Sequence, residues 1–129
     1  MKSFAGHVVL WGAPQNRLHD LGESLARLGF RVREVDSIEE VRSAIQGQGA
    51  DLVVTRLCGC FQYPLELLSW LQHVPSPPPV LIATGGVDVP LYLEAMRRGA
   101  FDCVGLPLNE SELVRIVTRA LEARQGTLQ

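Results

Sequence analysis

The stretch Ala50-Asp51-Leu52-Val53-Val54-Thr55-Arg56-Leu57 decides the fold. It is short, apolar and rich in β-branched residues, and it has no stripe of helical spacing. A run of this kind predicts a strand that is buried on both faces, in the middle of a parallel sheet. Ligands of such sheets bind beyond the carboxyl ends of the strands. Arg56, a permanent cation, therefore occupies a position where chemistry is expected.

Other extended runs alternate with helical patterns on both sides of this strand. We expect further strands at residues 7–11, 31–35, 80–84 and 101–106, and helices at about 16–28, 38–46, 65–71, 88–99 and 110–123. Strict alternation of strand and helix predicts a doubly wound parallel sheet with helices on both faces, an α/β fold of the flavodoxin-like type. The second strand is the most polar, which indicates an edge and the strand order 2-1-3-4-5.

The helix boundaries carry their own signals. Ser37, three residues before Glu40, has the spacing of a capping box at the start of the second helix. Gly29 is expected to end the first helix. A chain of 129 residues suits one domain, which we place at 1–124, followed by a frayed polar tail at 125–129.

Composition excludes several classes of function. The formal net charge of −2 gives no electrostatic footprint for nucleic acid or for an anionic membrane surface. Apolar runs are shorter than the roughly 18 residues of a membrane span, and the first residues do not resemble a signal peptide. Three cysteines, an odd number, favour a reducing compartment. We therefore expect a cytoplasmic protein without direct nucleic-acid or membrane partners.

Four blocks of sequence resemble the receiver domains of two-component response regulators, in the family's order. They are Ala50–Val54, Leu65–Leu68, Pro79–Thr84 and Ala95–Ala100, which match the third strand, the third helix, the fourth strand with its switch threonine, and the segment before the fifth strand. The resemblance covers nearly the whole chain. It implies a role in bacterial signal transduction, within a phosphorelay, and not an enzyme.

The functional positions of the family are replaced in this chain. The magnesium-binding acidic pair falls on Gly12 and Ala13, the phospho-accepting aspartate on Arg56, the lysine on Leu106 and the aromatic switch residue on Cys103, whereas Thr84 is kept. Phosphoryl transfer to a carboxylate requires a nucleophilic oxygen and a divalent cation. Glycine and alanine side chains offer magnesium no ligand, and a guanidinium repels it. We therefore expect neither phosphorylation, nor a bound metal, nor another cofactor.

Two alternatives remain for Arg56. Its side chain can pair with a carboxylate such as Asp36 or Asp88, or extend its charged end into water. It can instead form an anion-binding pocket with the hydroxyl of Thr84 and the backbone N–H groups of Gly85 and Gly86. The second alternative predicts a small-ligand or anion sensor.

The segment Cys58-Gly59-Cys60 suggests redox chemistry only weakly. A disulfide across one intervening residue closes a small, strained ring that is easily reduced. The three histidines show no spacing with these cysteines that would complete a metal site. We therefore interpret Cys58 and Cys60 as small side chains that line a loop, and a disulfide switch remains the alternative.

Without the phosphorylation chemistry, the remaining function is binding. In the resembling family, the face of the fourth helix, fifth strand and fifth helix carries dimer and target contacts. Here that face is predicted to contain Leu91, Tyr92, Ala95, Arg98, Cys103, Arg115 and Arg119. Apolar residues mixed with arginine are typical of interfaces, although a partly buried and partly solvated helix face looks similar. The leading interpretation is a phosphorylation-independent protein-interaction module that binds a signalling partner or forms a homodimer.

Overall fold

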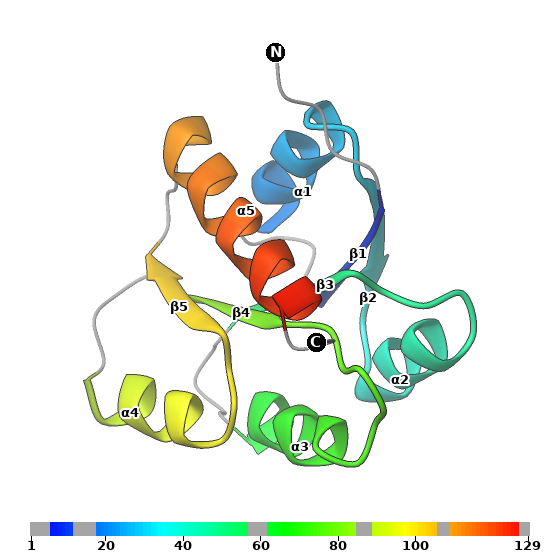
Figure 1. Ribbon diagram of the computed structural model, residues 1–129, viewed down its shortest axis with the longest axis vertical. Coiled ribbons are helices and arrows are strands. Elements are labelled where there is room, and N and C mark those ends of the chain that lie inside the picture. The colour runs from blue at the N-terminus through cyan, green and yellow to red at the C-terminus, as the bar shows by residue number, and fades with distance from the viewer. Residues whose placement is uncertain (1–5, 12–17, 57–61, 85–88, 106–108, 127–129) are drawn as a thin grey trace.

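Five strands alternate with five helices along the described part of the chain. The computed structural model describes residues 6–11, 18–56, 62–84, 89–105 and 109–126. The elements are β1 (His7–Trp11), α1 (Leu18–Arg27), β2 (Arg31–Val35), α2 (Ile38–Gln46), β3 (Leu52–Arg56), α3 (Gln62–Leu71), β4 (Val80–Thr84), α4 (Val89–Arg97), β5 (Asp102–Gly105) and α5 (Glu110–Gly126). Each of the first four helices connects one strand to the next, and α5 follows β5, as the alternation predicted (Figure 1).

The strands form one parallel sheet in the order β2-β1-β3-β4-β5, which confirms the predicted topology. β3 lies in the middle, and its residues Leu52, Val53 and Val54 are buried. β2 forms an edge and exposes Arg31 and Arg33, because a strand with only one neighbour needs fewer apolar side chains.

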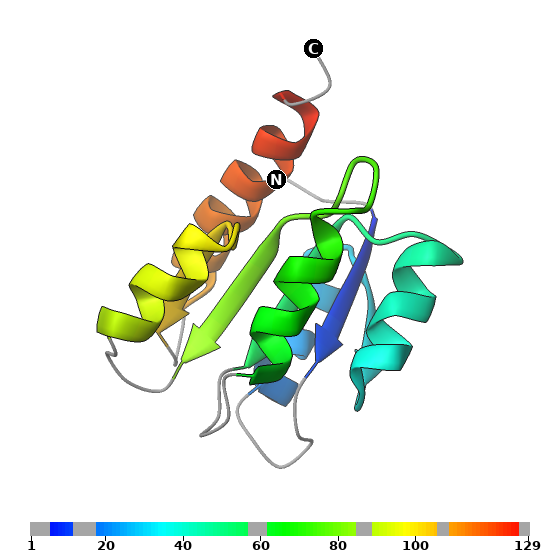
Figure 2. The same cartoon turned by 90° about the horizontal axis from the view of Figure 1, so that it is seen from below.

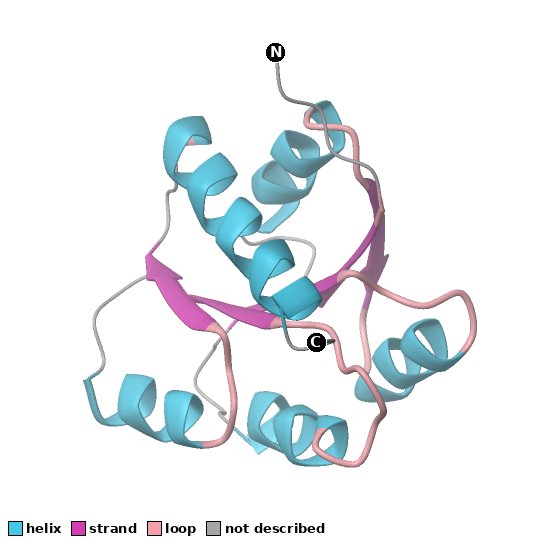
Figure 3. Cartoon of the chain, viewed as in Figure 1, coloured by secondary structure: helices cyan, strands magenta, loops and turns pink. Residues whose placement is uncertain are grey.

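The sheet lies between two layers of helices. α1 and α5 cover one face, and α2, α3 and α4 cover the other (Figures 1 and 3). Successive strand residues point to opposite faces, so each strand supplies both cores. Leu10, Leu52, Val54 and Leu81 pack with residues of α1 and α5, whereas Val9, Val53, Val80 and Ile82 pack with residues of α2, α3 and α4.

Helix boundaries mostly follow local chemistry. The backbone N–H of Glu40 donates to Ser37 Oγ at 3.2 Å, which confirms the predicted cap of α2. Asn109 caps α5 in the same way, with its Oδ1 2.8 Å from the backbone nitrogen of Glu112, although the sequence reading did not identify it. Gly29 ends α1 with φ +112°, as predicted.

Two boundaries differ from the prediction by three residues. α3 begins at Gln62, three residues before the expected start, because a proline such as Pro64 is tolerated in the first turn of a helix. α5 continues to Gly126, so residues 125 and 126 are helical although we expected a frayed tail there. Among the described residues, none of the helices combines the length and apolarity needed to cross a bilayer.

A clasp at the amino end of the sheet holds its three first strands together. Gly6 O accepts a hydrogen bond from Arg31 N at 2.9 Å, and His7 O accepts one from Asp51 N at 2.8 Å. The Asp51 carboxylate also accepts a bond from His7 N at 2.9 Å. Gly6 has φ +137°, and a Cβ there would lie 2.5 Å from Asp51 Oδ2, so this position requires glycine.

Candidate functional site

The carboxyl edge of the sheet is where the predicted site residues should meet. Parallel strands end at the same edge, as the arrowheads of β1 and β4 show (Figure 2). The register sets Trp11 beside Thr55, Arg56 beside Ala83, and Thr84 beside Gly105. The backbones of Arg56 and Thr84 therefore end neighbouring strands at one edge, one residue out of register.

Much of the predicted site falls outside the part of the chain that the structure describes. The positions concerned are Gly12, Ala13, Cys58, Cys60, Gly85, Gly86, Asp88 and Leu106, together with the side chains of Arg56 and Leu91. Asp36, one predicted partner of Arg56, is exposed at the end of β2. Both the ion pair and the anion pocket at Arg56 therefore stay predictions.

The described side chains at the carboxyl edge do not resemble a magnesium site. Thr55 is only 2% exposed, and Thr84 is half-buried. Trp11 is partly buried and packs against the core under α2, α3 and α4. Magnesium requires hard oxygen ligands, usually including carboxylates, which these three side chains lack. Within the described ranges, moreover, no three His, Cys, Asp or Glu side chains are grouped as metal ligands would be.

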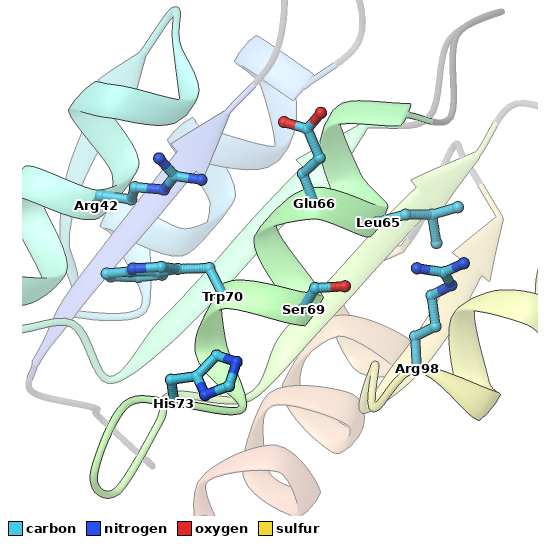
Figure 4. A pocket seen from close by; sticks show the side chains of 7 residues that line it. All are labelled: Arg42, Leu65, Glu66, Ser69, Trp70, His73 and Arg98. Atoms are coloured by element: carbon cyan, nitrogen blue, oxygen red, sulfur yellow. The ribbon is translucent and has the colours of Figure 1, made fainter.

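The predicted interaction face is divided by the fold. Ala95 is 0% exposed and belongs to the core, so its side chain cannot contact a partner. Arg98 directly follows α4 and lines a groove beside α3 (Figure 4). Cys103, on β5, is half-buried and packs against the same core as Ala95. Sequence spacing alone does not show which side of a helix or strand meets its neighbour.

The remaining part of that face is exposed. Tyr92 is 41% exposed, and Arg115 and Arg119 lie on the solvent side of α5. Leu93, which the sequence reading did not select, is 60% exposed. The sequence signal that could have indicated Leu93 is the apolar run from Val89 to Leu93, because a helix cannot turn all residues of a continuous apolar run toward one core.

Glu94 organises the charges at the end of α4. Its carboxylate accepts bonds from Arg98 Nε at 2.6 Å and from Arg97 Nη2 at 2.8 and 2.9 Å. The hydrogen bond from Arg98, followed by that from Arg97, lowers the pKa of Glu94. This carboxylate therefore stays ionised and directs Arg98 toward the groove beside α3.

Cys103 has the properties of a structural thiol. Burial raises the pKa of Cys103, and the negative charge of Asp102 raises it further. Because the thiolate is the reactive form, a raised pKa disfavours nucleophilic and redox chemistry. Cys103 is therefore a poor candidate for a functional cysteine.

A groove on the outer surface of α3 was not predicted. It has a volume of about 540 Å³ and is lined by Arg42, Leu65, Glu66, Ser69, Trp70, His73 and Arg98 (Figure 4). The Arg42 guanidinium lies over the ring of Trp70, 5.6 Å from its centroid. The residues that line the groove come from three separate segments of the sequence and are adjacent only in the fold.

Comparison with known proteins identifies relatives in bacterial regulation, although no protein-family model matches the chain. The chain is 32% identical over 127 residues to the C4-dicarboxylate transport transcriptional regulatory protein DctR of Rhodobacter capsulatus, covering 78% of this chain and 64% of DctR. It is 30% identical over 116 residues to the transcriptional regulatory protein FixJ of Bradyrhizobium diazoefficiens, covering 90% of this chain and 57% of FixJ. The chain thus spans less than two thirds of either regulator.

A solved structure supports the same grouping. The signal receiver domain of a putative LuxO repressor protein from Vibrio parahaemolyticus has a TM-score of 0.80, with coverage of 95% of this chain and 94% of that domain. Its sequence identity is 19%, so this likeness concerns the fold. Strand order, layers and regulator relatives agree, and the homologues and structural neighbours of this chain are receiver domains of response regulators.

Proposed function

We propose that this receiver domain transmits signals by binding proteins, without phosphorylation of an aspartate. The observation that supports this proposal is Arg56 at the last position of β3, the strand end that carries the acceptor aspartate in the family. The magnesium-binding positions after β1 are Gly12 and Ala13, which lack carboxylates. The acceptor and its metal ligands are thus replaced together.

Electrostatic repulsion by Arg56 also opposes magnesium binding and phosphoryl transfer at this position. Two like charges about 4 Å apart near a protein surface repel each other by several kcal/mol. Arginine cannot relieve the repulsion by losing its proton. Arg56 therefore opposes both a magnesium ion and the charge that develops during phosphoryl transfer.

Binding is the function for which the domain keeps suitable surfaces. Tyr92 and Leu93 are exposed on α4, and Arg115 and Arg119 on α5. Aromatic, apolar and arginine side chains are enriched at protein interfaces. We assign a signalling partner or a second copy of the chain to this surface. We further propose that the protein acts in the bacterial cytoplasm and that the receiver domain comprises residues 1–124.

The phosphorylation part of this proposal is tested by exposing the whole chain to acetyl phosphate and magnesium and measuring its intact mass. We expect no added phosphoryl group. The matched variant Gly12→Asp/Ala13→Asp/Arg56→Asp introduces aspartate at the acceptor position and at the two magnesium-binding positions. It is the positive control, and we expect it to gain a phosphoryl group. A hydroxylamine-sensitive phosphoryl adduct on the unaltered chain would contradict the proposal.

A second candidate is a sensor of small anions at the carboxyl edge. It is favoured by the register, which ends Arg56 and Thr84 on neighbouring strands. A ligand at a hundred times its dissociation constant stabilises a protein by about 2.7 kcal/mol. A thermal-shift series with inorganic phosphate and nucleotides should then raise Tm, and Arg56→Gln should abolish the increase. Unchanged Tm values throughout would exclude this candidate.

A further inference from the structure

The outer surface of α3 has the chemistry of a docking site that is separate from the carboxyl edge. We infer that this surface, between Arg42 on α2 and Arg98 just after α4, binds an acidic segment of a partner protein. The two arginines lie on opposite sides of α3 (Figure 4). This docking site is independent of the α4 and α5 surface proposed above.

Arg42 is held in place without an anionic partner among the described residues. Its Nε atom is buried and makes no hydrogen bond, and its guanidinium rests over Trp70. Because Nε is buried, the atoms of the guanidinium that a ligand can reach are the two terminal Nη groups. The cation–π contact orients the guanidinium but leaves its donors to a ligand. A carboxylate is the planar anion that a guanidinium binds with two parallel hydrogen bonds.

Arg98 supplies the second cation. Its Nε donates to Glu94, but that carboxylate is shared with Arg97, so the three side chains together keep one positive charge. The bond from Nε fixes the side chain, which extends into the groove beside Leu65 (Figure 4). A fixed arginine loses less conformational entropy on binding than a free one, which favours recognition at this position.

The spacing of the two arginines selects a polypeptide ligand. They stand on either side of α3, and an α-helix with its side chains is about 10–12 Å wide. One phosphate or carboxylate cannot reach both guanidinium groups, whereas two acidic residues on one peptide segment can. Trp70 and Leu65 offer apolar contacts near the two cations, and Ser69 lies between them.

Glu66 lies between the two arginines on the same surface of α3 (Figure 4). The two cations stand apart and the chain has a formal net charge of −2. A segment with two separated carboxylates therefore matches this surface better than a uniformly anionic chain such as a nucleic acid.

The test uses a helical probe peptide that carries two glutamates two turns apart, roughly 10 Å along the helix axis. Titration of the ¹⁵N-labelled whole chain should shift the Trp70 indole resonance and the amides of α3. Arg42→Gln and Arg98→Gln should each raise the dissociation constant at least tenfold. Arg27→Gln, which removes an exposed arginine of α1 on the other face of the sheet, is the matched control and should leave the dissociation constant unchanged.

Three results would overturn the inference, provided that the variants keep the amide spectrum of the folded chain. The first is equal binding of a peptide in which glutamine replaces both glutamates. The second is equal binding by the Arg42→Gln variant. The third is the same set of shifts with inorganic phosphate or a single-stranded oligonucleotide. Because phosphorylation plays no part in this titration, its outcome is independent of the acetyl phosphate experiment.

Discussion

The two ends of the same sheet differ in what their residues do. At the amino end, backbone hydrogen bonds and one carboxylate join the first three strands through Gly6, His7, Arg31 and Asp51. At the carboxyl end, β3 ends at Arg56, which we propose stands in place of the family's acceptor. The backbone bonds of the amino end and the apolar burial of the middle do not involve Arg56. The replacement that we propose at the carboxyl end would therefore leave these stabilising contacts in place.

The largest effect is expected in the middle of the sheet. Leu52 is fully buried on β3, so Leu52→Ala should lower the free energy of unfolding by about 2–5 kcal/mol through lost burial and a residual cavity. Urea denaturation followed by circular dichroism measures this change. The same substitution at the exposed Leu93 is the control, and it should stay within about 0.5 kcal/mol. Equal losses at both positions would mean that the buried middle does not carry the stability.

The amino-end clasp should give the next largest effect. Gly6→Ala places a Cβ against Asp51 Oδ2 and forces a non-glycine residue to adopt φ +137°. Strain of this kind costs on the order of 2 kcal/mol. Gly105→Ala is the matched control, because a Cβ there has open space around it. A Gly6→Ala protein that unfolds at the same urea concentration as the unaltered chain would show that the clasp is dispensable.

The strand pattern explains why the fold could be predicted from sequence. The central strand β3 is buried on both faces and therefore carries apolar residues such as Leu52, Val53 and Val54. The edge strand β2 can carry Arg31 and Arg33, so the polarity of each strand indicates whether it lies in the middle or at the edge of the sheet. The cap at Ser37 was predictable because it depends on residues three positions apart. Local or periodic constraints of this kind remain visible in a single sequence.

The surfaces were less predictable because they depend on helix rotation. Ala95 and Arg98 were assigned to one face with Tyr92, but packing turns Ala95 into the core and Arg98 toward α3. Arg42 and Trp70 are far apart in sequence and meet only after α2 and α3 pack on the sheet. No spacing rule indicates such a contact, so the groove became visible only in three dimensions.

A smaller effect is expected where α2 begins, at the carboxyl end of β2. Ser37→Ala removes the acceptor of the Glu40 N–H and should destabilise the protein by about 1 kcal/mol. Thermal unfolding measures the loss, and Ser37→Asp, which keeps an acceptor, is the control that should recover it. A loss as large as that of Leu52→Ala would contradict the view that this end contributes little to stability.

The smallest effect should come from the surface charges near the end of α4. Arg98 and Arg97 lower the pKa of Glu94, so its folded-state pKa lies below the unfolded value. The stabilisation by this carboxylate is then complete above the ordinary glutamate pKa and is lost as the pH falls through the lowered folded value.

A ¹³C carboxyl titration should show the pKa of Glu94 rising toward its ordinary range in Arg98→Gln, and rising less in Arg97→Gln, since the bond from Arg98 is the larger cause. Solvent screens these exposed pairs, so the accompanying change in stability should be slight. An unshifted Glu94 in the unaltered chain would show that Arg98 is not fixed by this bond, which would remove one support of the docking site beside α3.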